Sequence, residues 1–154
     1  MDADAGKKIG KFNNKYKRYS IFELSSVVFG IEILAVKEIV PLPNITRIPN
    51  ADPFVVGVFS LRGIITTLID IRHIFGLKVN SIQNENMVLL LEYGSLKIGI
   101  LIDKVLDIMN INRSEIKTEY ENIPNQISKF VYGLYESNDF GIIHLLDLAK
   151  FKIF

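Results

Sequence analysis

The sequence contains no cysteine, and only two of its 154 residues are histidine. Without cysteine the chain can form neither a disulfide bond nor a thiolate metal site, and it has no thiolate nucleophile. The two histidines, His73 and His144, are too few for a histidine-rich metal site. These absences remove several large classes of enzyme and metalloprotein from consideration.

An excess of charge of one sign is also missing, as are long apolar runs. The chain carries 18 basic and 17 acidic residues, a formal net charge of +1, so no overall attraction to nucleic acid is expected. No run of about eighteen consecutive apolar residues occurs, and the first twenty residues lack the apolar core of a signal peptide. The sequence therefore predicts a cytoplasmic protein without direct membrane insertion.

Catalytic motifs are absent too. The chain has no glycine-rich phosphate-binding loop, no nucleophile elbow and no H-E-x-x-H zinc motif. The nearest approach to an acid–base cluster is Asp70 with His73, where a helix cap and a surface group are the favoured interpretation. His144 stands in an apolar run, which favours a structural or an outward-facing side chain. We expect no catalytic residue, no metal site and no cofactor.

What the sequence does contain is a series of short, β-branched segments separated by Gly, Pro, Asn and Ser. Hydrophobic residues make up 49% of the chain, enough for a core of its own. Such spacing predicts an all-β domain built of closed or paired sheets. The predicted strands lie in residues 19–24, 27–33, 55–61, 63–71, 87–93, 96–102, 131–136 and 140–148.

The sequence also repeats itself. Residues 21–40 and 90–109 align at an offset of 69 with seven identities and no gap, among them Gly30 with Gly99 and Val36 with Val105. Such a repeat indicates two similar β units of about seventy residues each. Each unit supplies a hairpin and further strands, enough for a small barrel whose closure removes exposed edges.

Domain boundaries and short helical turns follow from local composition. Residues 1–17 are polar and basic, which predicts a flexible N-terminal tail that is solvated or makes a weak contact with an anionic surface. Residues 18–154 form a single domain of two similar β-barrel subdomains. Asp70 and Asp147 are predicted N-caps of short helical turns, with Gly76 ending the first, and Asp52 before a proline predicts another short helical turn that Asp52 caps.

Residues 48–77, IPNADPFVVGVFSLRGIITTLIDIRHIFGL, resemble the signature of CheW-like domains. In that signature R-I-P-N-A-x-x-F-x-x-G-V is followed by N-L-R-G, an apolar strand and D-L-R-x-x-F-G. The flanking segments FGIEILAVKEIV and IGILIDKVLDIM are similar to family patterns as well, so the resemblance extends from Tyr19 to about Leu148. It implies two intertwined five-stranded SH3-like β-barrels.

The resemblance also implies a function. Family members without a kinase or receiver region, for which this chain has no room, act as stand-alone adaptors in chemotaxis. Such an adaptor couples the cytoplasmic tips of chemoreceptors, the methyl-accepting chemotaxis proteins, to the regulatory CheW-like domain of the histidine kinase CheA. It is a non-catalytic scaffold that its partners hold in membrane receptor arrays. Two alternatives are a scaffold of a non-chemotaxis chemosensory pathway and a nucleic-acid-binding double β-barrel.

By resemblance at matching positions, two partner surfaces are expected. Arg62 and Glu38 form the predicted charged pair, whose value would lie in recognition. The predicted receptor-binding groove comprises Val36, Glu38, Arg62, Met87, Val105 and Ile108. The predicted kinase-binding surface comprises Ile33, Gly57 and Val58. Ser60 and Thr67 depart from the family's usual Asn and Pro, which leaves partner affinity and preference open.

Overall fold

The strand β1 (Tyr16–Leu24) shows why this sequence forms a sheet with two covered faces. Tyr19 and Ile21 pack in one apolar cluster, whereas Phe22 and Leu24 pack in another. Successive side chains of a strand point to opposite faces, so a strand with apolar residues on both faces must be covered on both. The two clusters supply that cover.

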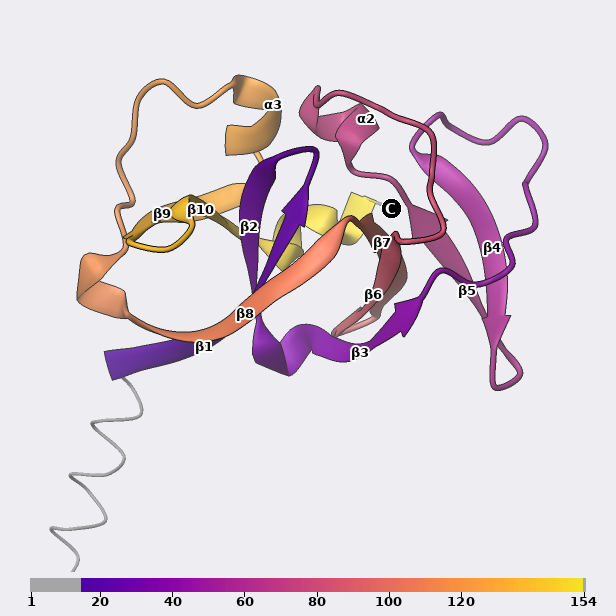
Figure 1. The fold of residues 1–154 in the computed structure, drawn as a ribbon, viewed down its shortest axis with the longest axis horizontal. Helices are drawn as coiled ribbons and strands as arrows, with labels where there is room; N and C mark the ends of the chain where they lie inside the picture. The colour runs from indigo at the N-terminus through magenta and orange to yellow at the C-terminus, as the bar shows by residue number, and fades with distance from the viewer. Residues whose placement is uncertain (1–14, 154) are drawn as a thin grey trace, which may run out of the picture.

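Residues 15–153, which the computed structural model describes, contain two five-stranded sheets (Figure 1). Sheet A has the order β8 (Lys104–Asn112), β1, β2 (Val27–Glu32), β10 (Gly141–Leu146) and β9 (Val131–Ser137). Sheet B has the order β3 (Val36–Pro41), β6 (Met87–Tyr93), β7 (Leu96–Ile102), β5 (Ile64–Ile69) and β4 (Val55–Leu61). Four short helices lie between strands of the described range: η1 (Ile33–Ala35), α2 (Arg72–Phe75), η2 (Arg113–Glu115) and α3 (Asn125–Ser128). A fifth, η3 (Leu148–Ile153), follows β10.

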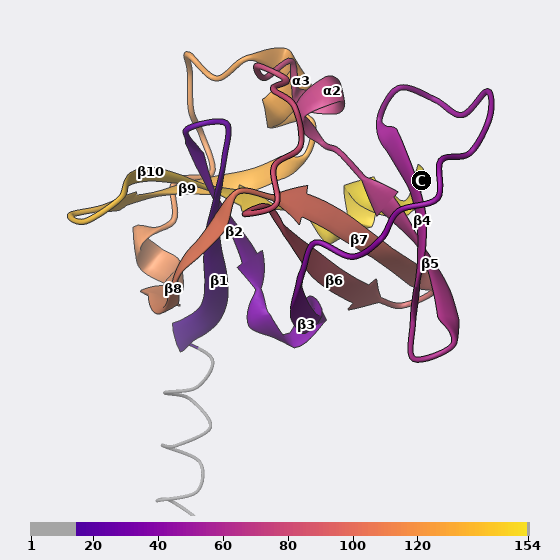
Figure 2. The same cartoon turned by 45° about the vertical axis from the view of Figure 1, so that its right-hand side comes forward.

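The two halves of the chain are interleaved. Sheet A combines the first-half hairpin β1–β2 with β8, β9 and β10, and sheet B combines the second-half hairpin β6–β7 with β3, β4 and β5. The strand orders match one for one, so the sheets are related by the internal repeat. Figure 2 shows β9 and β10 on the side opposite to β4 and β5. The expected intertwined all-β fold is confirmed, and the simpler interpretation of one unit per barrel is wrong.

The repeated glycine lies where the halves meet. Gly30 in β2 pairs in parallel with Leu145 of β10, and Gly99 in β7 pairs in parallel with Leu68 of β5. A Cβ at Gly30 would lie 2.8 Å from the Leu145 side chain, and a Cβ at Gly99 would lie 2.8 Å from Val88. Any larger residue would therefore press on the barrel interior.

Each sheet is closed by a short β-bridge between its two edges. In sheet B the bridge is made by the segment after β3, and in sheet A by the segment after β8. Thr46 exchanges two backbone hydrogen bonds of 2.8 Å with Val58 of β4. In the other half Lys117 exchanges two of 2.9 Å with Leu134 of β9. The bridges pair part of the outer edges of β4 and β9, which limits edge-to-edge association.

Three apolar clusters fill the molecule. One lies inside each barrel, around Phe59 and Leu68 in sheet B and around Tyr19 and Ile143 in sheet A. The largest is shared between the sheets, and a chain of aromatic rings runs through it. The ring centroids of Phe22 and Phe29, Phe29 and Phe75, Phe75 and Phe130, and Phe130 and Phe151 lie 5.3–5.5 Å apart.

Three local expectations need correction. The predicted tail of residues 1–17 lies mostly outside the described residues, but Tyr16 and Lys17 belong to β1 because they pair with β8. The segment at Asp52 forms a single turn, with the Val55 N–H donating to its carbonyl at 2.9 Å, and no helix. Strands β3 and β8 were not among the predicted strands, because their outward residues are charged and interrupt the apolar pattern.

Candidate partner-binding surface

The hairpin β4–β5 turns at Arg62 and Gly63, which both have positive φ, 49° and 80°. Two positive φ values in a two-residue loop are those of a type I′ turn, where Asn-Gly is the favoured pair. An arginine in the left-handed region is strained, since its Cβ crowds the backbone there. A strained residue at an exposed turn is an indication of function.

Arg62 and Glu38 are the two predicted groove residues that the structure brings into direct contact. Arg62 donates from Nη1 to Glu38 Oε2 at 2.7 Å and from Nη2 to Oε1 at 2.5 Å. These hydrogen bonds hold the pKa of the Glu38 carboxyl below its ordinary value, and they raise the pKa of Arg62. The fork-to-fork geometry fixes the guanidinium plane while the Arg62 side chain stays 68% exposed.

Beside this pair lies a groove with a volume of about 310 Å³. The exposed part of its apolar wall comes from the β4–β5 hairpin, where Ile64 and Ile65 are 60% and 74% exposed, and residues of β6 and β7 line the rest. The rim carries charges that are paired among themselves: Lys37 lies 3.4 Å and Lys97 4.0 Å from Glu92. An apolar slot with a charged rim is suited to an amphipathic helix.

The other predicted groove residues lie on three strands of both sheets. Val36 in β3, Met87 in β6 and Val105 in β8 are partly buried against the shared central cluster. Ile108, also in β8, is 54% exposed. These four side chains do not line the groove beside Arg62. Their predicted role in receptor binding stays a prediction.

The predicted kinase-binding residues have unequal surroundings. Ile33 lies in η1 and is partly exposed, and Val58 pairs with Thr67 of β5. Gly57 is buried, and a Cβ built on it would overlap the carbonyl oxygen of Thr46. The close approach that this glycine permits is therefore made by the chain itself, and contact of Gly57 with a partner stays a prediction.

Several exposed apolar residues were missed from the sequence. Leu34, next to Ile33 in η1, is 96% exposed, and Ile64 and Ile65 form the groove wall. Consecutive apolar residues point to opposite faces of a strand, so two isoleucines directly after a tight turn cannot both face the same core. The Ile64–Ile65 pair was therefore the feature of the sequence that indicated an exposed apolar residue.

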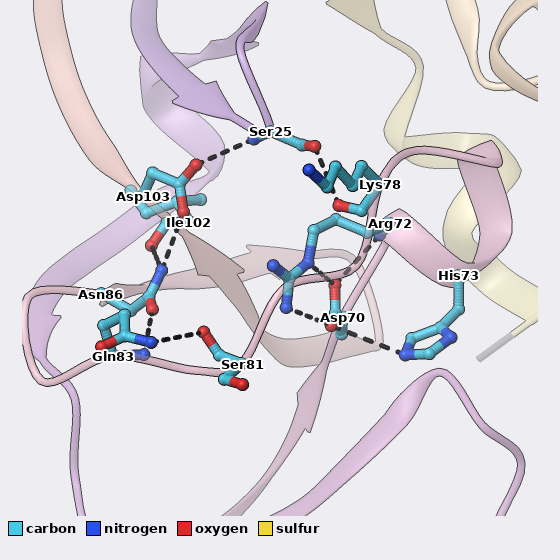
Figure 3. Close-up of polar contacts among 10 residues, drawn as sticks. All are labelled: Ser25, Asp70, Arg72, His73, Lys78, Ser81, Gln83, Asn86, Ile102 and Asp103. Carbon is cyan, nitrogen blue, oxygen red and sulfur yellow. Dashed lines mark hydrogen bonds and ion pairs between the residues drawn. The ribbon is translucent and has the colours of Figure 1, made fainter.

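Figure 3 shows the contacts of Asp70, one of the two residues predicted as caps. Asp70 Oδ1 accepts from the Arg72 N–H at 3.1 Å, and the Arg72 side chain donates to both carboxylate oxygens at 2.9 and 2.8 Å. Ile71, one residue later, is the formal cap of α2, and Gly76 ends it in the left-handed region. Asp147 Oδ1 accepts from the Ala149 N–H at 3.1 Å.

The histidines have local partners. His144 Nδ1 lies 3.0 Å from the carbonyl oxygen of Val28, in agreement with a structural role, and His73 Nε2 lies 3.7 Å from Asp70. Within the described range, no group of three or more His, Asp or Glu side chains is placed to hold a metal ion. The helices of the same range are all too short or too polar to cross a membrane.

Comparison with known proteins gives consistent results. The family model described as "CheW-like domain" matches residues 18–152. A protein named chemotaxis protein CheW from Klebsiella aerogenes is 31% identical over 146 residues, which cover 95% of this chain and 84% of that protein. A CheW from Helicobacter pylori is 29% identical over 138 residues, covering 90% and 82%. The crystal structure of scaffolding protein TtCheW from Thermoanaerobacter tengcongensis matches with a TM-score of 0.77 and 26% identity, covering 86% and 85%.

Proposed function

The chain belongs to the CheW-like domain family, and from this premise we propose that it is a chemotaxis adaptor that couples chemoreceptors to the histidine kinase CheA. It acts as a non-catalytic scaffold, in agreement with its likeness to the scaffolding protein TtCheW. The family match over residues 18–152 carries this proposal. Its partners hold it at receptor arrays on the cytoplasmic side of the membrane.

The receptor contact is assigned to the region of Glu38 and Arg62. The cytoplasmic tip of a receptor is a helical hairpin, and an amphipathic helix binds through apolar anchors with charges at the margin. The groove offers Ile64 and Ile65 as apolar contacts and the Arg62 fork as a fixed donor. The three remaining N–H groups of the guanidinium are available to carboxylates of the receptor.

The kinase contact is assigned to the surface around Ile33 and Val58. The adjacent Leu34 supports this assignment because an almost fully exposed leucine is a suitable anchor for a partner. The regulatory domain of CheA is itself CheW-like in this family, so the contact joins one barrel to another. Such a heterologous contact can continue into rings or arrays.

The proposal is tested by co-purification of the full chain with a receptor tip and with CheA. The Arg62→Asn variant keeps a residue suited to the type I′ turn but removes the guanidinium. We expect receptor binding to weaken about tenfold or more, as for a central contact residue, with an unchanged melting temperature. The control is Asn138→Ala in the corresponding β9–β10 turn, which should bind normally.

The kinase contact needs a separate variant. Leu34→Asp should reduce capture of CheA and leave capture of the receptor intact, because it changes an exposed side chain at the other assigned surface. If the wild-type chain captures neither a receptor nor a histidine kinase from its native cells, the adaptor role is wrong. If it captures both and Arg62→Asn binds receptors normally, only the assigned groove is wrong.

A further inference from the structure

The internal repeat places Asp147 where Asp70 stands in the first half. Each backbone N–H donates to the carbonyl of a phenylalanine, Asp70 to Phe54 and Asp147 to Phe130, both at 2.7 Å. Each carboxylate accepts the N–H of the residue two positions on, both at 3.1 Å. The two aspartates therefore have the same local backbone contacts in the two halves.

The two halves differ in the side chain that contacts the aspartate carboxylate. In the first half Arg72 follows Asp70 by two residues, and its buried guanidinium covers both oxygens (Figure 3). In the second half the corresponding residue is Ala149, which has no charged side chain. Within residues 15–153, no Lys or Arg nitrogen lies within 4.0 Å of the Asp147 carboxylate. The cation that neutralises this position in one half has no counterpart in the other.

A cavity of about 200 Å³ adjoins Asp147. Lys17 and Glu32 also line it, and the Lys17 ammonium donates to Glu32 at 2.6 Å. Two carboxylates and one ammonium give the lining one unbalanced negative charge. Tyr93 and Tyr132 complete the polar part of the wall. Lys152 lies over the Tyr93 ring, 5.7 Å from its centroid, and is not among the residues that line the cavity.

We propose that this cavity binds the guanidinium of an arginine side chain of a partner protein, which occupies the place that Arg72 holds in the first half. A guanidinium matches the carboxylate fork in two parallel hydrogen bonds, which an ammonium cannot do. Two tyrosines also line the cavity, and tyrosine rings attract planar cations. This site is separate from the groove beside Arg62, so it does not depend on the assigned receptor contact.

The proposal is tested by NMR on the full chain with a small probe, N-acetyl-arginine amide, and its neutral analogue, N-acetyl-citrulline amide. The Ala149 N–H reports on the site because it donates to Asp147. We expect saturable shifts of this amide with the arginine probe and none with the citrulline probe. In Asp147→Asn, which keeps an acceptor for the cap and loses the charge, the response should disappear.

A second variant is designed to place an arginine of the chain itself in the cavity. Ala149→Arg recreates the spacing of Asp70 and Arg72, so we expect its melting temperature to rise by about 2–4 °C and its response to the arginine probe to be lost. Ala149→Gln is the neutral control and should not stabilise. The proposal is overturned if the citrulline probe gives equal shifts, if Asp147→Asn still responds, or if Ala149→Arg still binds the probe.

Discussion

The carbonyl oxygen of Thr46 occupies the space in which any residue other than glycine at position 57 would place its Cβ. Gly57 also has a φ of 153°, within the range that side chains disfavour. The contact exists because Thr46 bridges to the adjacent Val58 and so completes the pairing of β4. Gly133 repeats the arrangement against Ile116 and Lys117 in the other barrel.

Gly57→Ala is therefore expected to lower the free energy of unfolding by at least about 3 kcal/mol, because the new methyl group must displace backbone. Gly63→Ala is the matched comparison, since it has positive φ but no atom within 4 Å of its Cβ. Its cost should be the backbone strain alone, about 1–2 kcal/mol. Urea denaturation measures both, and equal losses would contradict the assigned contact. It also follows that a charged residue at position 57 cannot serve as a probe of partner binding.

The pKa of Glu38 provides a test of the Arg62 contact in solution. Hydrogen bonds from Arg62 lower this pKa from its ordinary value of 4.5. The pair therefore stabilises the folded state above the ordinary pKa, and that contribution is lost as the pH falls through the lowered one. In Arg62→Asn the carboxyl carbon signal of Glu38, followed by NMR, should titrate at a higher pH than in the wild type. An unchanged titration would mean that the two side chains are apart in solution.

The buried pair of Asp70 and Arg72 should be sensitive to loss of either partner. Both side chains are 3–4% exposed, and removing one charge leaves the other buried and unpaired. Arg72→Met is expected to cost about 3–5 kcal/mol of unfolding free energy, and adding Asp70→Asn should restore part of it. His73→Gln, at a 35% exposed side chain 3.7 Å from Asp70, is the control and should cost little. A double variant as unstable as the single one would argue against charge as the cause.

The tyrosine pair in sheet A gives a prediction for alkaline pH. The hydroxyls of Tyr19 and Tyr132 are hydrogen-bonded to each other, and burial raises both pKa values above 10.0. The neutral phenols stabilise the folded state fully below pH 10.0, and this contribution is lost as the pH rises beyond it. Tyr132→Phe should move the midpoint of alkaline unfolding, followed by circular dichroism, to higher pH. Ionisation of Tyr132 before unfolding would contradict the burial of the pair.

The sequence predicts the fold class because it repeats short, apolar, β-branched segments separated by turn residues, which is the pattern of strands buried on both faces. It does not predict which strands share a sheet, since the pairing of Gly30 with β10 depends on contacts far apart in the chain. For the same reason the sequence does not predict that the loop containing Thr46 packs on Gly57, since the two residues are brought together only by the fold.

The candidate site is predicted in part. Arg62 and Glu38 are identifiable because they stand at positions that match the signature of CheW-like domains. The groove wall at Ile64 and Ile65 was missed because an apolar residue in a strand suggests burial, although two consecutive isoleucines after a tight turn indicate that one of them is exposed. The exposure of Leu34 is not predicted either, because it depends on the position of η1 outside the two sheets.

The exchange of hairpins between the two sheets is the arrangement of a strand-exchanged dimer whose two copies are joined into one chain. In a true homodimer both barrels would carry identical residues, so the molecule would present two copies of each binding surface. When the two copies are joined in one chain, corresponding positions can carry different residues. One barrel carries Arg62 in its hairpin turn and Arg72 on its aspartate, while the other carries Asn138 and Ala149, so that two barrels with the same strand order present different surfaces.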